Sequence, residues 1–306
     1  MERNKKIVIL AGGNSEEREV SLESSRQIAK TLKKYQIHMI DPSSFNSYLL
    51  MVEKIKSIDP LIVFNGLHGA EGEDGRIQAL LELENIQFSG SRFRASAICM
   101  DKIISRLLAK CIGIIVPPNI VLHNKKKADL DKIISKISLP LVVKPNDSGS
   151  SVGITIVQNK SELNSSIEKA FAYSEKVICE KYITGRELTV TILDNKALPV
   201  VEIKPKTGWY DFTNKYTHGK TIYEVPAKLT SQEKEKIQRQ SLKIFRKIGC
   251  KSYGRVDFRY DGNNFYFLEV NTLPGMTELS LTPMAAAEAG LDFESLLEKI
   301  IATSLD

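Results

Sequence analysis

One turn in the last third of the chain determines how the residues on both sides of it must pair. Two runs rich in aromatic and aliphatic residues, both within 254–277, flank Asp261-Gly262-Asn263-Asn264. This composition is typical of a hairpin turn, so we predict two neighbouring antiparallel strands. We expect the hairpin to be symmetric about Asn263, which fixes the register of every pair along it.

In that register Asp257 lies opposite Glu269, and Arg255 lies opposite Asn271. Side chains alternate between the two faces of a strand, so these four residues share one face. Two carboxylates and an amide oxygen beside an arginine would suit Mg²⁺, which prefers oxygen ligands. The alternative is a solvated face with a simple Arg–Asp pair, and the hairpin alone does not decide between them. We expect the other face to pack on a core through Val256, Phe258, Leu268 and Val270.

Length and charge narrow the class of protein. A chain of 306 residues exceeds the usual size of one core and predicts two or three domains. The net charge of +6 could favour a small polyanion, but a nucleic-acid site would need clustered basic residues. The only dense run, Lys125-Lys126-Lys127, is followed at once by Asp129 and Asp131, and we interpret it as a solvated loop leading into a helix. No nucleic-acid partner is predicted.

Cysteine spacing and hydropathy predict a cytoplasmic protein. Cys99, Cys111, Cys179 and Cys250 form no Cys-x-x-Cys pattern, and we expect small buried residues in a reducing compartment, with no zinc site or disulfide. No apolar run is long enough to span a membrane. The apolar run at 7–11 is too short for a signal peptide and is better interpreted as a first strand.

The first third of the chain alternates strands and helices. We predict strands at 7–10, 37–40 and 61–64, and helices at 19–34 and 75–84. This βαβ pattern implies a parallel sheet with ligands near the carboxyl ends of its strands.

The remaining elements are more mixed. We predict a helix at 101–110 and strands at 141–145, 154–157 and 177–183, and strands dominate from Glu187 onward. A loop at 205–224 and a basic helix at 231–248 interrupt those strands, and two helices close the chain after Pro283 and Asp292.

A small, glycine-rich loop, Ser148–Gly153, lies between two predicted strands. Such a loop can bring successive N–H groups onto phosphate oxygens. It lacks the Gly-Lys-Ser/Thr ending and the following helix of a P-loop, and it could equally be a flexible turn. Lys144, at the end of the preceding strand, strengthens the phosphate interpretation.

The loop after the first strand, Gly12–Glu19, carries acidic residues where a dinucleotide-binding turn would receive a pyrophosphate. Gly-x-Gly-x-x-Gly is absent, although Asp41 could act as the ribose acid of such a turn. Glu16 and Glu17 would repel phosphate and favour an ammonium group, or they could simply form an acidic helix cap. His68 lies in a glycine-rich loop after the third predicted strand, where it could line a site.

Taken in order, these segments resemble the D-alanine–D-alanine ligases of the ATP-grasp superfamily. The resemblance runs along nearly the whole chain, with a small departure at Glu278-Leu279. It is carried by 12–21, Leu67-His68-Gly69, Met100-Asp101-Lys102, Val143-Lys144-Pro145 with 149–153, Glu180-Lys181, Gly185-Arg186-Glu187, Lys215-Tyr216, and 254–257 with 268–277.

The resemblance implies a fold class of α/β and α+β: an N-terminal parallel-sheet domain at 1–97 and a two-lobed ATP-grasp fold at 98–184 and 185–306. It implies that ATP phosphorylates the carboxylate of one D-alanine and that the amine of a second D-alanine attacks the acyl phosphate, for peptidoglycan precursor synthesis. It also implies two Mg²⁺ ions, which Mn²⁺ can replace, and a homodimer.

The resemblance assigns the nucleotide and metal roles residue by residue. Phosphates fall to Lys102, Lys144 and the 150–153 loop with Ser151, and the γ-phosphate to Lys215. The adenine and ribose pocket falls to Glu180, Lys181, Ile183 and Glu187. The metal ligands are Asp257, Glu269 as the bridging carboxylate, and Asn271.

The resemblance also assigns the amino-acid sites. Glu17 takes the ammonium of the first D-alanine and His68 lies near its carboxylate. Arg255 and the N–H of Gly275 stabilise the oxyanion, and Ser280 and Leu281 receive the second substrate's carboxylate. Tyr216, Ser150 and Glu17 hold the 205–224 loop closed over the site.

Three other functions stay open at this point. A related ligase could join D-alanine to D-lactate, although Tyr216 favours an amine nucleophile. A second possibility is an ATP-binding protein without catalysis, against which the intact Asp257, Glu269 and Asn271 argue. A third is a nicotinamide-dependent dehydrogenase built on the first βαβ unit.

Overall fold

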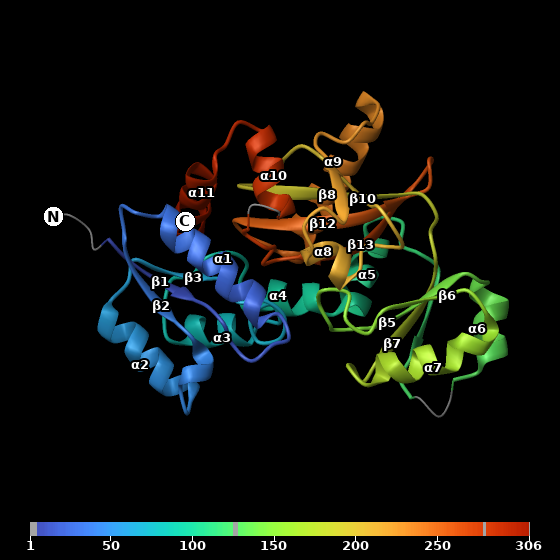
Figure 1. The fold of residues 1–306 in the computed structure, drawn as a ribbon, viewed down its shortest axis with the longest axis horizontal. Helices are drawn as coiled ribbons and strands as arrows, with labels where there is room; N and C mark the ends of the chain where they lie inside the picture. The colour runs from blue at the N-terminus through green and yellow to red at the C-terminus, as the bar shows by residue number, and fades with distance from the viewer. Residues whose placement is uncertain (1–4, 125–127, 278–279, 306) are drawn as a thin grey trace.

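Three β-sheets organise the chain in the computed structural model, which describes residues 5–124, 128–277 and 280–305 (Figure 1). The Lys125–Lys127 run and the Glu278-Leu279 departure lie outside the described residues. The strands of the three sheets fall within 6–65, 119–181 and 186–271. The exact domain limits given above stay a prediction.

The first sheet is parallel, with strand order β2-β1-β3, as the βαβ pattern predicted. Its elements are β1 (Lys6–Leu10), α1 (Arg18–Thr31), β2 (Gln36–Ile40), α2 (Tyr48–Ile58), β3 (Ile62–Asn65), α3 (Arg76–Leu83) and α4 (Phe93–Met100). The predictions did not include α2 and α4, and α1 ends earlier than expected. Gly12 allows the sharp exit from β1 because its φ is +87° and a Cβ there would lie 2.7 Å from Asp41 Oδ2.

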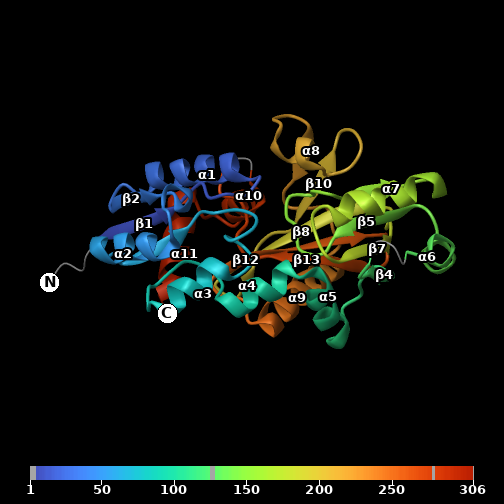
Figure 2. The same ribbon diagram turned by 90° about the horizontal axis from the view of Figure 1, so that it is seen from below.

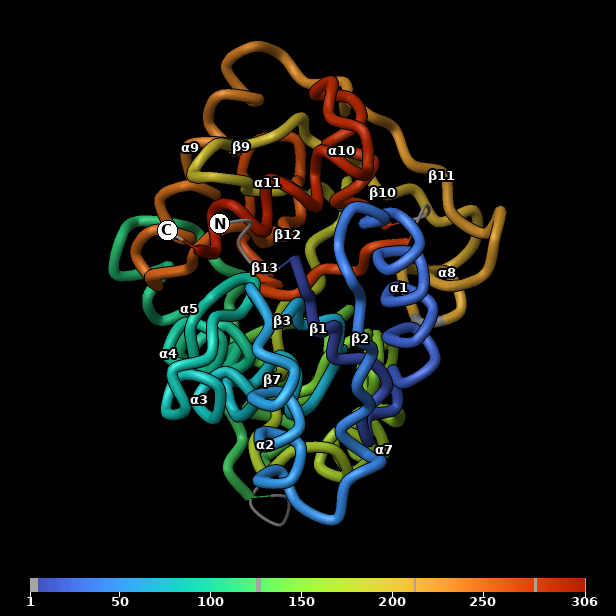
Figure 3. The backbone as a smooth tube through the Cα atoms, turned by 90° about the vertical axis from the view of Figure 1, so that its left-hand side faces the viewer, coloured from blue at the N-terminus to red at the C-terminus, as the bar shows by residue number. Residues whose placement is uncertain are grey.

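One face of this sheet is buried by the other end of the chain. Ile7, Ile9 and Phe64 share a core with Leu297 and Ile301 of the C-terminal helix. That helix, α11 (Phe293–Leu305), follows α10 (Leu281–Glu288) and lies beside α1, so both chain ends meet in one layer (Figure 3).

The second sheet is antiparallel and has the order β4-β7-β5-β6. Its strands are β4 (Asn119–Leu122), β5 (Leu141–Pro145), β6 (Thr155–Val157) and β7 (Val177–Lys181). Two helices, α6 (Leu130–Ile137) and α7 (Lys160–Phe171), form a core with it. A further helix, α5 (Lys102–Cys111), leads into this lobe and lies along the third sheet at β13.

The third sheet has the order β11-β10-β8-β12-β13, with β9 added to β8. Its strands are β8 (Arg186–Leu193), β9 (Lys196–Ala197), β10 (Val201–Pro205), β11 (Thr221–Glu224), β12 (Tyr253–Tyr260) and β13 (Phe265–Asn271). The predicted helix α9 (Ser231–Ile248) packs on one face, begun by a Thr230–Glu233 capping box. The predicted loop 205–224 contains a short helix, α8 (Phe212–Tyr216), which stands above β10 in Figure 2.

The predicted hairpin register is correct at 255–257 and wrong from Phe258 to the turn. Asp257 pairs with Glu269, as predicted, but Phe258 pairs with Phe267 because a bulge shifts the register by one residue. Leu268 is the extra residue. It leaves the core face on which we expected it and is half-buried beside a cavity instead.

Three of the four cysteines are buried, and the expectation fails for Cys111, which is exposed near the end of α5. None forms a disulfide, and Cys99 and Cys250 lie with their Sγ atoms 3.6 Å apart. Among the helices within the described ranges, none combines the length and apolar character needed to cross a membrane.

Candidate functional site

Two connected cavities lie where the three sheets meet. The first has a volume of about 570 Å³, within the range of small-molecule sites, and the second about 130 Å³. Their linings share five residues: Lys102, Tyr210, Lys215, Arg255 and Glu269. Three of the five are cationic, so any anion passing between the cavities meets positive charge there.

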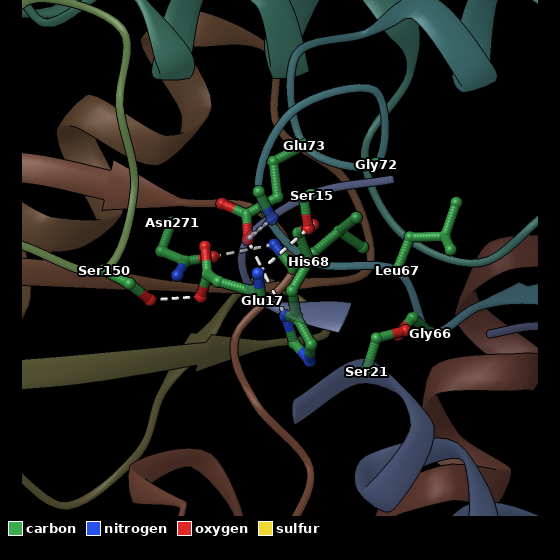
Figure 4. A network of polar contacts seen from close by, with 12 residues as sticks. Ser15, Glu17, Ser21, Gly66, Leu67, His68, Gly72, Glu73, Ser150 and Asn271 are labelled. Atoms are coloured by element: carbon green, nitrogen blue, oxygen red, sulfur yellow. Dashed lines mark hydrogen bonds and ion pairs between the residues drawn. The ribbon is translucent and has the colours of Figure 1, made fainter. Parts of the chain in front are cut away.

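Residues from three distant parts of the chain join in the first cavity. Ser150, from the 148–153 loop, hydrogen-bonds to Glu17, which immediately precedes α1. Tyr216, from the end of α8, donates to Glu17 Oε1 at 3.2 Å and lies 2.9 Å from Ser150 Oγ. The predicted trio is therefore assembled (Figure 4 shows the Glu17–Ser150 contact).

A histidine and a second carboxylate surround Glu17. Burial raises the pKa of Glu17, and the charge of Glu73 raises it further. Burial disfavours the charged form of His68, but Glu73, at 3.7 Å from Nδ1, and Glu17 outweigh this and raise its pKa. The backbone N–H of Gly69 also donates to Glu73 at 3.0 Å, which fixes the loop that carries His68. The two carboxylates, Glu17 buried and Glu73 half-buried, make this end of the cavity suited to an ammonium group.

The Arg–Asp pair on the hairpin face exists, but it is not solvated. Arg255 donates from Nε and Nη2 to the two oxygens of Asp257, both at 2.8 Å, and each side chain is only 12% exposed. The guanidinium of Arg255 lines both cavities. Burial disfavours its charge, but Asp257 outweighs burial and raises the pKa of Arg255.

The far wall of the first cavity is the start of α10. Ser280 precedes this helix, and its Oγ accepts from the N–H of Thr277 at 3.0 Å. Gly275, Ser280 and Leu281 all line the cavity. The free N–H groups of a helix start attract carboxylates.

A buried ion cluster lies beside the second cavity. Glu180 Oε1 accepts from Lys144 at 2.6 Å, and Glu180 Oε2 pairs with Arg106 of α5. Burial lowers the pKa of Lys144 to about 8, assisted by the positive charge of Arg106. Burial alone would raise the pKa of Glu180, but the two cations outweigh it and lower that pKa. The two cations therefore hold Glu180 as a carboxylate, and burial disfavours the charged form of Lys144.

The other predicted nucleotide residues lie around the same cavity. Ser151, Lys181, Ile183, Glu187 and Lys215 all line it, and Ser151 also hydrogen-bonds to the carbonyl of Tyr210 at 3.1 Å. Each predicted site residue thus lines at least one of the two cavities.

The predicted metal ligands Asp257 and Glu269 are paired across β12 and β13, and Asn271 lies two residues beyond Glu269 on the same strand. Within the described ranges, no three side chains drawn from His, Cys, Asp and Glu form a metal-binding group. The predicted set holds only two such residues, Asp257 and Glu269, and its third donor is the amide oxygen of Asn271. Burial opposes ionisation of Glu269, but Lys102 and the other nearby cations lower its pKa to about 2. Glu269 Oε2 lies 3.3 Å from Lys102 Nζ. Ionised carboxylate and amide oxygens are a donor set that fits Mg²⁺.

Sequence reasoning missed charged residues of the site, among them Arg106 and Glu73. Arg106 lies four residues after Lys102 on one helix, so both reach the same face, and that spacing was a usable signal. Glu73 lies in the loop that carries His68, but nothing in the sequence indicates that the loop folds back to bring them together.

Comparison with known proteins gives a consistent result. Two family models match, one described as D-ala D-ala ligase N-terminus over residues 42–91 and one as D-ala D-ala ligase C-terminus over 108–302. A D-alanine–D-alanine ligase of Methylacidiphilum infernorum is 43% identical over 97% of this chain and 95% of its own length.

Solved structures agree with this result. A D-alanine–D-alanine ligase of Bacillus anthracis superimposes with a TM-score of 0.87 at 39% identity, and its complex with ATP with 0.84 at 36%, each over 98% of this chain and 97% of that chain. VanG, a D-Ala:D-Ser ligase of Enterococcus faecalis, gives a TM-score of 0.83 at 31% identity over 99% of this chain and all of that chain.

Proposed function

The chain belongs to the D-alanine–D-alanine ligase family, and from this membership we propose that it joins two D-alanines to D-alanyl-D-alanine, driven by ATP. The product would serve peptidoglycan precursor synthesis. The observation that carries the proposal is the junction of the two cavities at Lys102, Arg255 and Glu269. A nucleotide in one cavity and an amino acid in the other would meet there.

The first step activates a carboxylate. A carboxylate oxygen of the first D-alanine attacks the γ-phosphorus of ATP, ADP leaves, and an acyl phosphate forms. We assign Glu17 to the ammonium of this D-alanine and His68 to the neighbourhood of its carboxylate, because both are buried in the first cavity. Lys102, Lys144 and Lys215 offset the phosphate charge during transfer.

The second step forms the peptide bond. The uncharged amine of the second D-alanine attacks the acyl carbon, a tetrahedral intermediate forms, and inorganic phosphate leaves. We assign Arg255 and the N–H of Gly275 to the oxyanion, where losing one donor typically costs about 3–4 kcal/mol. The start of α10, at Ser280 and Leu281, would receive the second carboxylate.

Magnesium belongs to the proposal as a resident cofactor. Asp257, Glu269 and Asn271 would hold two Mg²⁺ ions, which Mn²⁺ can replace. When bound, the ions would neutralise the charge of the transferring phosphates. The depressed pKa of Glu269 supports this assignment, because a ligand must be deprotonated to bind a cation.

Loop motion follows from the size of the second cavity. At about 130 Å³ it lies below the 300–1,000 Å³ typical of ligand sites, so a nucleotide enters only when the surrounding segments move. Trp209 and Tyr210 of the 205–224 loop line this cavity. We propose that the loop opens for entry and closes to exclude water from the acyl phosphate.

The test is release of phosphate with one amino acid at a time. With ATP and Mg²⁺, we expect turnover with D-alanine alone, and little stimulation by L-alanine or by D-lactate added to D-alanine. A clear preference for D-lactate or D-serine as the second substrate would replace the assignment with that of a related ligase. Absence of ADP formation with every substrate would support an ATP-binding protein without catalysis.

Two further points remain part of the proposal. The family resemblance supports a homodimer, which sedimentation would test. It also supports a cytoplasmic location, which fractionation of cells would test.

A further inference from the structure

One arginine in the nucleotide cavity has no assigned role. Arg259 lies on β12, two residues beyond Asp257, and lines the second cavity with its side chain 18% exposed. Its Nε donates to the carbonyl of Ile183 at 3.1 Å, and its Nη2 donates to the carbonyl of Gly185 at 2.8 Å. Its Nη1 donates to Glu187 Oε2 at 3.3 Å.

Both backbone contacts go to one short segment, and Glu187 follows it at the start of β8. Residues 182–185 join the last strand of the second sheet, β7, to the first strand of the third sheet, β8. The guanidinium of Arg259 also lies 5.6 Å from the ring centre of Tyr182. Gly185 has a φ of +121°, and a Cβ there would collide with the carbonyl of Tyr260. The crossover between the two lobes is therefore clamped against the end of β12.

Arg259 also places a positive charge beside the carboxylate of Glu187. Glu187 is desolvated, and burial raises its pKa, while Arg259 supplies the largest opposing effect. Without that cation the carboxylate would be buried with its closest counter-charge removed, and its neutral form would be favoured. Arg259 thus holds the crossover backbone by two hydrogen bonds and places a positive charge beside the carboxylate of Glu187.

We propose that Arg259 is a positioning residue for the nucleotide, clamping the 182–185 crossover and orienting Glu187 so that its carboxylate accepts a hydrogen bond from a ribose hydroxyl. The inference rests on the proposed function in one respect, that the cavity receives ATP. Arginine suits this role because its planar fork reaches three acceptors at once, whereas a lysine ammonium cannot span them.

The test combines variants with modified nucleotides. Arg259→Met should weaken ATP binding about tenfold, the effect of losing roughly one charge-assisted hydrogen bond, with kcat and the KM for D-alanine within about twofold of wild type. Arg259→Lys keeps the positive charge but lacks the planar guanidinium, so its ATP affinity should lie between those of the wild type and Arg259→Met. Isothermal titration calorimetry with ATP measures the affinity independently of catalysis.

The discriminating measurement uses 2′-deoxyATP and 3′-deoxyATP. The wild-type protein should bind at least one of them more weakly than ATP, because a site built around a hydroxyl rejects the analogue that lacks it. In Arg259→Met this discrimination should shrink, and adding Glu187→Gln should shrink it no further. A general loss of stability would not change the ratio between nucleotides.

The matched control is Arg186→Met. Arg186 donates to both oxygens of Glu202 at 2.9 and 2.6 Å in the same sheet, but it lines neither cavity. It should lose an ion pair while keeping wild-type ATP affinity and discrimination. Wild-type affinity and discrimination in Arg259→Met would overturn the inference. If the wild-type protein released no phosphate, the proposed function would fail, while the calorimetry would still decide the role of Arg259.

Discussion

Removing one hydroxyl from the 205–224 loop should weaken its proposed closure by a predictable amount. In Tyr216→Phe, Glu17 Oε1 loses a donor at 3.2 Å and Ser150 Oγ loses a neighbour at 2.9 Å. A hydrogen bond to a charged group is worth about 1.5–3 kcal/mol. Tyr216 is 41% exposed, so water replaces part of this and the lower end applies. A loss of about 1.5 kcal/mol shifts the closed–open equilibrium about tenfold.

The kinetic consequence is specific to one substrate. Because the lost contact is to the carboxylate assigned to the first D-alanine, the KM for D-alanine should rise about tenfold and that for ATP much less. Trp209 provides a second readout, since it is the only tryptophan and lies in the same loop. Its fluorescence, titrated with D-alanine in the presence of ADP, should require a higher concentration for half of the change.

Tyr223→Phe is the matched control for the same loop. Tyr223 lies on β11, and its hydroxyl is 3.1 Å from that of Tyr210, a contact between two uncharged groups. We expect both KM values to stay within about twofold of wild type, because Glu17 keeps all its partners. Unchanged constants in Tyr216→Phe, or an equal rise in both KM values, would refute the reasoning.

Three further variants test other parts of the site and fold. Glu269→Gln should abolish turnover while leaving the thermal unfolding midpoint near wild type; near-normal rates in Mg²⁺ would contradict the metal assignment. Arg106→Met leaves the buried carboxylate of Glu180 with one cation instead of two, so the free energy of unfolding in urea should fall by about 3 kcal/mol, and an unchanged value would show that the pair is dispensable. Although burial opposes it, the hydrogen bonds from Arg18 and from neighbouring groups lower the pKa of Asp41 to about 2 from 3.8, so this carboxylate stabilises the fold above pH 3.8 and the contribution is lost as pH falls toward 2. Asp41→Asn should therefore flatten the acid limb of the stability profile, and an identical limb would count against the pairing.

Elements with a clear hydrophobic periodicity or a capping motif were predicted from the sequence. The capped α9 and the parallel first sheet follow from periodicity and turn chemistry. Apart from the short α8, local patterns did not predict the helices α2, α4 and α7. In α2, Met51, Val52 and Ile55 are buried while Leu49 is exposed. Its apolar residues therefore do not lie on a single face of the helix, and the sequence shows no clear amphipathic pattern there.

Long-range contacts explain the other differences. The predicted symmetry about Asn263 gives the correct residue pairs near the site. It does not predict the bulge at Leu268, whose backbone contacts a residue 162 positions away in the sequence. The carbonyl of Leu268 accepts from Arg106 Nε at 3.1 Å, and α5 lies along β13. No pattern within the hairpin encodes that partner, so sequence reasoning placed Leu268 on the core face.

In the proposed function, the carboxylate of Glu17 links binding of the first D-alanine to closure of the 205–224 loop. Burial and Glu73 raise the pKa of Glu17, which weakens its charged form, while an ammonium group beside it would favour that form. An ionised Glu17 is the stronger acceptor for Ser150 and Tyr216. Binding of the first D-alanine should therefore strengthen both contacts that close the loop, and closure must by linkage tighten D-alanine by the same factor. The loop should then close mainly when the first D-alanine is bound, so that water is excluded from the acyl phosphate formed from it. Tyr216→Phe should reduce this coupling while leaving nucleotide binding to the open form intact.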